Sequence, residues 1–79
     1  MAKNDYKNLR PDRCAKLLIK NGWEFTNREG THETYAKNIG GKICFLQVIY
    51  NDKTLYPSNA KNMIEKSDIP LSEWIKNCK

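Results

Sequence analysis

The sequence is poor in the residues that build metal centres and disulfide frameworks. It contains one histidine and three cysteines, and Cys14, Cys44 and Cys78 are widely spaced. No Cys-x-x-Cys pair occurs, and a single histidine cannot complete a zinc site of the usual kind. We therefore expect reduced cysteines that serve as small apolar residues, and neither a metal nor a cofactor.

Long apolar runs and glycine-rich loops are also missing. No stretch is apolar for long enough to span a bilayer, and the polar first residues do not resemble a signal peptide. No glycine-rich loop joins a strand to a helix, which argues against nucleotide binding of the P-loop or Rossmann kind. These absences predict a cytoplasmic protein that does not associate with membranes.

Positive charge is in excess. The 79 residues include 14 Lys and Arg against 9 Asp and Glu, which gives a net charge of +5. This excess favours a polyanionic partner, with nucleic acid ahead of membrane, although it also fits lysines that only keep a small protein soluble. The length predicts a single domain over residues 1–79, with residues 1–10 as a flexible lead-in.

Hydrophobic periodicity predicts three helices and three strands. The expected elements are a helix opened by Pro11 and ended by Gly22, strands over 23–26, 31–37 and 42–50, a helix capped by Ser58, and a last helix over 71–78 capped near Ser72. Residues 27–30, 38–41 and 51–53 read as turns or loops. The order α-β-β-β-α-α indicates a two-layer α+β domain with a three-stranded antiparallel sheet and one open face, as in double-stranded-RNA-binding domains.

Strand alternation bears on the single histidine, His32, in the segment EGTHETYAKN. Trp23 and Phe25 are expected to face the helices, and Tyr35 is the best core candidate of the second strand. With Tyr35 inward, His32 points out through the open face among small neighbours, and Glu33 takes the Tyr35 side. A bulge just before this strand would reverse the assignment.

The third strand, KICFLQVIY, is apolar on both of its sides. One side holds Ile43, Phe45 and Ile49, and the other holds Cys44, Leu46, Val48 and Tyr50. A strand with one solvent-facing side does not usually show this pattern. We therefore expect the open face to be covered in part by a partner chain, a second copy or the terminal helix.

RNA cleavage is the reaction that one imidazole and several cations can support. The substrate supplies its own 2′-hydroxyl nucleophile, histidine titrates near neutral pH, and lysines or helix N-terminal amides stabilise charge at phosphorus without a metal. From chemistry and spacing alone, a surface role for His32 is the simpler interpretation.

Residues 9–74 resemble the HicA toxins, the ribonuclease half of HicAB toxin–antitoxin modules. The similar parts are KLLIKNGW at 16–23, REGTH at 28–32 with its Gly-Ser/Thr-His pattern, and the helix over 59–66. The resemblance implies a double-stranded-RNA-binding-like fold, metal-independent cleavage of mRNA that inhibits translation, and His32 as the catalytic histidine. It also implies a HicB-like antitoxin that masks the site, and it allows an oligomer in complex with that antitoxin.

The chain departs from the HicA pattern at two places. Glu33 stands where many members have a second histidine. A carboxylate there is expected either to favour the protonated imidazole of His32 or to repel phosphate. The segment over 50–58, YNDKTLYPS, has no glycine before the next helix, where the family usually has one. These differences concern substrate handling more than fold.

For an mRNA-cleaving toxin, His32 is expected to act as the general acid or base. Lys53, Lys61 and the amides near Ser58 are expected to contact phosphate, with Arg28 beside His32. Two alternatives remain open at this point. One is a non-catalytic RNA-binding module of the same fold, and the other is an interaction protein whose open sheet face binds another chain.

Overall fold

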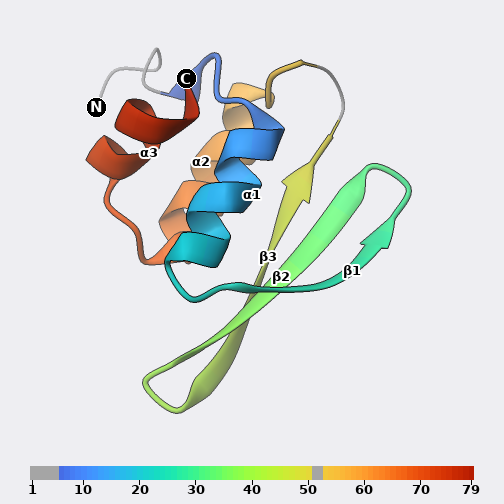
Figure 1. The fold of residues 1–79 in the computed structure, drawn as a ribbon, viewed down its shortest axis with the longest axis vertical. Helices are drawn as coiled ribbons and strands as arrows, with labels where there is room; N and C mark the ends of the chain where they lie inside the picture. The colour runs from blue at the N-terminus through green and yellow to red at the C-terminus, as the bar shows by residue number, and fades with distance from the viewer. Residues whose placement is uncertain (1–5, 51–52) are drawn as a thin grey trace.

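The computed structural model describes residues 6–50 and 53–79 of the chain. Within them the elements follow the order α1 (Pro11–Lys20), β1 (Glu24–Glu29), β2 (His32–Ile39), β3 (Lys42–Ile49), α2 (Pro57–Ser67) and α3 (Leu71–Cys78) (Figure 1). The strands form one antiparallel sheet in the order β1-β2-β3. The predicted α+β fold with a three-stranded antiparallel sheet is therefore confirmed.

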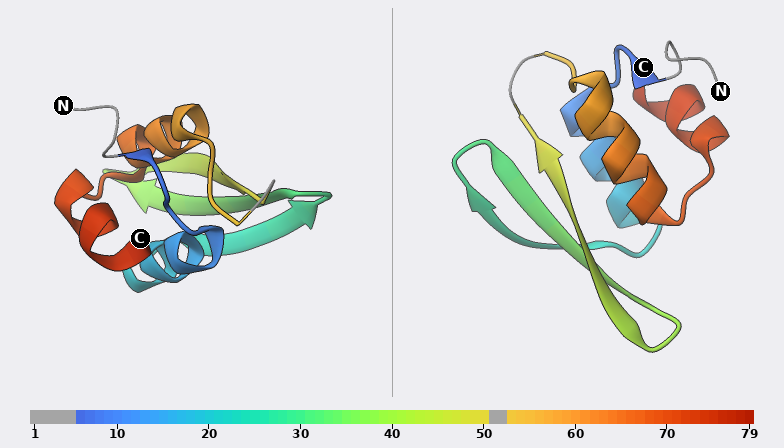
Figure 2. Two further views of the ribbon diagram at one scale, coloured as in Figure 1. Left: turned by 90° about the horizontal axis from the view of Figure 1, so that it is seen from above. Right: turned by 180° about the vertical axis from the view of Figure 1, so that it is seen from behind.

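The helices gather on one face of the sheet and leave the other face open (Figure 2). α1 packs against α3, while α2 lies along β3. The turn of the β2–β3 hairpin extends past the helices (Figure 1). The terminal helix therefore does not cover the open face, which removes one of the three covers that the sequence suggested.

The core lies between the helices and the sheet. Tyr35, Leu46 and Val48 point into it from β2 and β3 and are at most 3% exposed. The helices contribute the stripes that their periodicity predicts, namely Cys14, Leu17 and Leu18 of α1, Ala60, Met63 and Ile64 of α2, and Trp74 and Cys78 of α3. Burying one large apolar side chain is worth about 1.5–3 kcal/mol, so these residues carry the stability of the domain.

A Schellman turn carries the chain from α1 into the sheet. Gly22 has a φ of 91°, and the N–H of Trp23 donates to the carbonyl of Leu18 at 3.0 Å. Trp23 then lies 1% exposed in the core, and its Nε1–H donates to the carbonyl of Ser67 at 3.0 Å. The predicted left-handed cap at Gly22 is thus confirmed, and it fixes the direction in which β1 leaves the helix.

The first hairpin is tighter than the sequence suggested. Residues 27–30 were expected to form a turn, but β1 continues through Glu29, and the connection to β2 is only Gly30 and Thr31. Gly30, with a φ of 61°, takes the first position of this turn, where glycine is favoured. A bulge between Phe25 and Asn27 absorbs the extra residue of β1.

Phe25 lies on the expected side of the sheet but is not buried. It pairs with Tyr35, and the two rings meet edge to face with centroids 5.7 Å apart. Phe25 remains 50% exposed because β1 is an edge strand whose residues the helices leave exposed.

The lead-in prediction is wrong for residues 6–10. Leu9 is fully buried, and its carbonyl accepts the N–H of Leu55 at 2.8 Å. The N–H of Arg10 donates to the carbonyl of Cys78 at 2.7 Å, which ties the start of α1 to the end of α3. The other predicted lead-in residues, 1–5, lie outside the described part of the chain, as do residues 51–52 of the loop after β3.

The predicted caps of the last two helices are displaced by one or two residues. α2 begins at Pro57 with Tyr56 as its cap, so Ser58 lies inside the first turn. α3 begins at Leu71 with Pro70 as its cap. Pro57 suits the first helical position because its fixed φ is already helical and its missing N–H would be unpaired there. None of the helices in the described residues is long and apolar enough to cross a membrane.

Candidate active site

His32 lies at the start of β2, directly after the two-residue turn. Its side chain is exposed, whereas Tyr35, three residues further along, is 3% exposed in the core. The irregularity in the sheet falls in β1 and not in β2, so alternation along β2 is unbroken. The prediction that His32 points out through the open face is therefore confirmed.

Three residues surround the imidazole of His32 on the open face. The hydroxyl of Thr31 lies 3.3 Å from Nδ1, and no hydrogen bond to a described residue involves Nε2. Glu29 of β1 and Ile49 of β3 are the cross-strand partners of His32, so both side chains share its face. His32 therefore lies between a carboxylate and an aliphatic side chain.

Glu29 was missed by the sequence analysis because the whole segment 27–30 was taken as a turn. In a two-residue hairpin, the residues that flank the turn pair directly, with Cβ atoms about 4.5–5.5 Å apart. Reading REGTHE as such a hairpin would have placed Glu29 opposite His32. The structure thus places a carboxylate and an imidazole directly opposite one another on neighbouring strands.

Arg28 lies on the opposite face of the sheet from His32, which corrects the expectation that it would sit beside the histidine. It pairs with Glu33, and its Nη1 lies 3.5 Å from Oε2 of that carboxylate. Its Nε–H donates to the carbonyl of Gly30 at 3.0 Å, and its guanidinium lies 5.0 Å from the centre of the Tyr50 ring. The bulge in β1 causes this placement, since it reverses the side to which every later β1 residue points.

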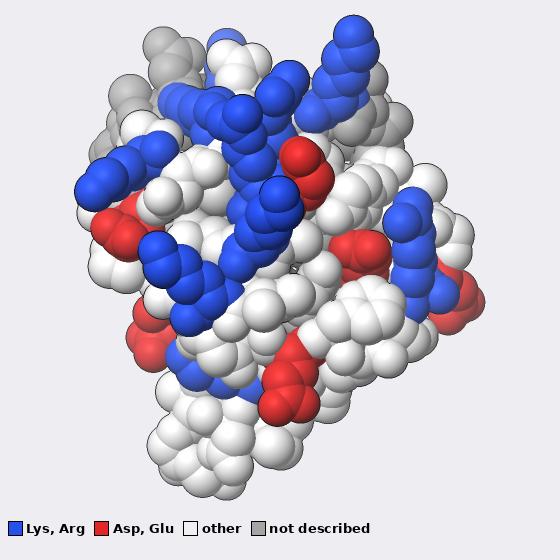
Figure 3. Space-filling view, viewed as in Figure 1, with Lys and Arg blue, Asp and Glu red and all other residues white. Residues whose placement is uncertain are grey.

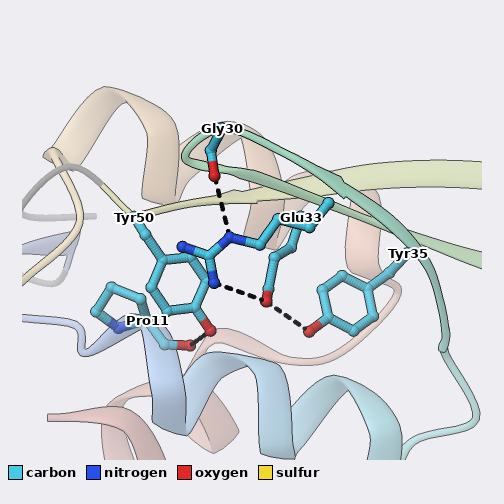
Figure 4. A network of polar contacts seen from close by, with 6 residues as sticks. Pro11, Gly30, Glu33, Tyr35 and Tyr50 are labelled. Atoms are coloured by element: carbon cyan, nitrogen blue, oxygen red, sulfur yellow. Dashed lines mark hydrogen bonds and ion pairs between the residues drawn. The ribbon is translucent and has the colours of Figure 1, made fainter.

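Glu33 belongs to the same network on the helix side of the sheet (Figure 4). Its Oε1 accepts the hydroxyl of Tyr35 at 3.0 Å, and the hydroxyl of Tyr50 donates to the carbonyl of Pro11 at 3.4 Å. Burial, together with the neighbouring Glu33 carboxylate, raises the pKa of Tyr50 to about 12 and also raises the pKa of Tyr35. Glu33 is therefore engaged by Arg28 and Tyr35 and lies on the far side of the sheet from His32.

The other predicted RNA contacts lie in α2 and in the segment just before it, not on the sheet. Lys53 is exposed in the segment before α2, Ser58 is exposed in the first turn of α2, and Lys61 is exposed one turn later. Lys61 follows Asn59 by two positions, which puts the two side chains about 200° apart around the helix. Since Asn59 faces β3, Lys61 points away from the sheet.

Lys66 is a cation of α2 that lines a hollow beside β3. This hollow between β3 and α2, here called the β3–α2 groove, is also lined by Ile49, the cross-strand partner of His32. Lys66 follows Asn59 and Asn62 at i+7 and i+4, so all three lie on one side of α2. The spacing of this polar stripe can be seen in the sequence, but the sequence prediction named Lys53 and Lys61 instead of Lys66.

A basic surface covers α1, away from the open face. Arg13, Lys16 and Lys20 line a groove of about 260 Å³ that Asn77 of α3 borders, here called the α1–α3 groove. Blue side chains gather over α1 in Figure 3. Arg13, Lys16 and Lys20 thus form a basic surface on the helix side that does not include His32.

The open face carries apolar side chains as well as His32. Ile43 and Phe45 are 55% and 59% exposed, in the half of β3 nearest the β2–β3 turn. No element of the described chain covers them, so a cover would have to come from another molecule.

The described residues contain no group of three or more His, Cys, Asp or Glu side chains that could hold a metal ion. Comparisons with protein-family models, curated proteins and solved structures found no match to this chain.

Proposed function

We propose that this chain is a cytoplasmic toxin of the HicA kind, a metal-independent endoribonuclease that cleaves mRNA and so inhibits translation. The observation that carries the proposal is the pairing of His32 with Glu29 on the open face of the sheet. Cleavage of RNA by its own 2′-hydroxyl needs one group that accepts a proton and one that donates a proton. This pair supplies both.

In the proposed reaction, the Glu29 carboxylate accepts the proton of the 2′-hydroxyl while the 2′-oxygen forms a bond to phosphorus. The bond from phosphorus to the 5′-oxygen breaks, and the imidazolium of His32 donates its proton to that leaving oxygen. The products are a 2′,3′-cyclic phosphate and a 5′-hydroxyl. Each proton in this scheme moves between the RNA and one of the two side chains. General acid–base catalysis of this kind contributes about 10²–10⁴-fold to the rate.

The test is cleavage of end-labelled RNA by purified protein in EDTA. We expect His32→Ala to lower the rate by about 10²–10⁴-fold and Glu29→Gln to lower it by about 10²-fold. Glu73→Gln on α3 is the matched control and should leave the rate unchanged. Cleavage that survives His32→Ala would overturn the role of His32, and cleavage abolished by EDTA would overturn the metal-free mechanism.

A HicB-like antitoxin is the proposed protein partner, bound to the open face over Ile43 and Phe45. These exposed apolar side chains support the proposal because a monomer gains nothing from leaving them in water. A small reading frame beside the gene, whose product co-purifies with this chain and blocks cleavage, is the expected finding. Phe45→Asp should weaken that complex.

A non-catalytic RNA-binding module is the second candidate. The α1–α3 groove supports it, because Arg13, Lys16 and Lys20 could bind phosphates without any group for proton transfer. This candidate predicts salt-sensitive RNA binding that yields no cleavage products.

A further inference from the structure

The β3–α2 groove is small and polar, with a volume of about 130 Å³. Leu46 and Met63 are its buried lining residues. Three amides and one ammonium surround them, on the side chains of Gln47, Asn59, Asn62 and Lys66. Pockets for whole small-molecule ligands usually measure about 300–1,000 Å³, so this groove has room for one flat ring and little else.

The amides of the groove have no partner within the described residues, in contrast to other asparagines of the chain. Asn21 and Asn77 donate to backbone carbonyls at 2.8 and 2.7 Å, and Asn38 accepts the N–H of Gly41 at 3.0 Å. No hydrogen bond to a described residue involves the side chains of Asn59 and Asn62. Their donors and acceptors therefore remain available to a ligand.

The free edge of β3 adds backbone groups to the same groove. The N–H of Tyr50 donates to the carbonyl of Thr31 at 2.7 Å, so the backbone groups of Val48 and Tyr50 face β2. In an antiparallel pair this direction alternates, so the N–H and C=O of Gln47 and Ile49 face away from β2. Both residues line the groove, which thus combines an unpaired strand edge with free side-chain amides.

Ile49 connects the groove to His32. The two residues are directly opposite one another and form a non-hydrogen-bonded pair, in which Cα atoms are about 4.5 Å apart. Anything held in the groove is therefore separated from the strand that carries the imidazole by β3, that is, by one strand spacing of roughly 4.8 Å plus its own distance from β3.

We propose that the β3–α2 groove binds one unpaired nucleobase of the RNA and so places the adjoining phosphate at His32. This inference rests on the proposed function and names the form of its substrate. A base edge offers donors and acceptors that neutral amides can match, and Asn or Gln pairs with adenine through two hydrogen bonds. Lys66, at the end of the same stripe, takes a neighbouring phosphate.

The substrate is accordingly single-stranded RNA at the site of cleavage. In an A-form duplex the bases are stacked and paired, so none can enter a groove of this size. The α1–α3 groove does not compete for this role, because its three cations offer charge to the backbone and only one amide to a base.

The test measures binding of a ten-nucleotide single-stranded RNA to the full-length His32→Ala protein, which removes the proposed cleavage. Fluorescence anisotropy gives the Kd, and ¹H–¹⁵N spectra locate the bound RNA. We expect Asn62→Ala to raise the Kd for oligo(A) about 10-fold, whereas its matched control Asn77→Ala changes it less than twofold. Lys66→Ala should lower the salt dependence of binding by about 0.7 in log K per log salt, and Lys20→Ala is its control.

Chemical-shift changes confined to residues 46–49 and 59–66 would support the groove. Chemical-shift changes confined to α1, with larger losses of RNA affinity for Asn77→Ala or Lys20→Ala, would overturn the proposal that the β3–α2 groove binds a base. They would still show that the protein binds RNA. Equal affinity for oligo(A), oligo(U) and oligo(C) would overturn base recognition. Absence of any RNA binding would overturn the proposed function, and the groove inference with it. Thermal unfolding of each variant checks that the fold is retained.

Discussion

The two faces of the sheet are made by alternate residues of the same strands, yet they differ in nearly every property. On β3, Leu46 is 3% exposed against the helices, while its neighbour Gln47 is exposed on the open face. On β2, Tyr35 belongs to the core and His32 to the solvent-facing surface. Alternate residues of one strand can therefore have different roles in a small domain. Those on the helix side stabilise the fold, and those on the open face are available to a ligand.

Several polar groups show the same contrast, although the buried Nε1 of Trp74 in the core has no hydrogen-bond partner within the described residues. On the helix side, Glu33 is held by Arg28 and Tyr35, and the indole of Trp23 is held by Ser67. Along β3 and α2, the groove amides have no partner within the described residues. Satisfied polar groups fix a fold, whereas unpartnered groups that converge on one place can bind a ligand. The two faces should therefore respond differently to substitution.

The largest expected difference comes from adjacent residues of β3. Leu46→Ala removes a buried side chain and should lower the free energy of unfolding by about 2–5 kcal/mol. Gln47→Ala, one residue away on the open face, should change it by about 0.5 kcal/mol or less and should instead weaken RNA binding. Urea denaturation of the two variants makes the comparison, and equal losses of stability would contradict the separation of the faces.

Much of this separation could be predicted from the sequence. The apolar stripes of the three helices, the order of strands, the cap at Gly22 and the outward direction of His32 all follow from local periodicity and turn chemistry. Each depends on residues that are close together in the chain, so short-range patterns determine them.

The rest depends on contacts between distant segments. Leu9 is buried because the start of the chain lies against Leu55 and the end of α3, and no local pattern contains that information. Arg28 and Glu29 exchange faces relative to a regular strand because of a bulge that propensity does not reveal. His32 therefore points outward as expected, whereas Arg28 does not lie beside it as expected.

A smaller effect is expected at Glu33, the residue where the resemblance to HicA toxins fails. Glu33→Gln removes an ion pair with a half-exposed arginine but keeps an acceptor for Tyr35, so the free energy of unfolding should fall by about 1 kcal/mol or less. The rate of RNA cleavage should stay within about twofold of wild type, because Glu33 lies on the opposite face from His32.

The control for that prediction is Glu65→Gln, an exposed carboxylate on α2, which should leave stability and rate unchanged. A double-mutant cycle with Arg28→Ala isolates the coupling between the two charges. A large change in cleavage rate on Glu33→Gln would show that a residue on the helix side affects catalysis on the open face. The separation of the two faces would then be wrong.

A further expected effect is a pH dependence to which Tyr50, on the helix side, contributes. The pKa of Tyr50 is raised to about 12 in the folded protein by burial and by Glu33, against about 10 in an unfolded chain. Its contribution to stability is therefore complete below pH 10 and is lost as the pH rises from 10 towards 12. Urea midpoints measured from pH 8 to pH 11.5 should fall above pH 10, and Tyr50→Phe should reduce that fall, while Tyr56→Phe, whose ring is 55% exposed, should not. If both substitutions reduced it equally, the network around Glu33 would not distinguish the two tyrosines, and the helix side would owe its stability to apolar packing only.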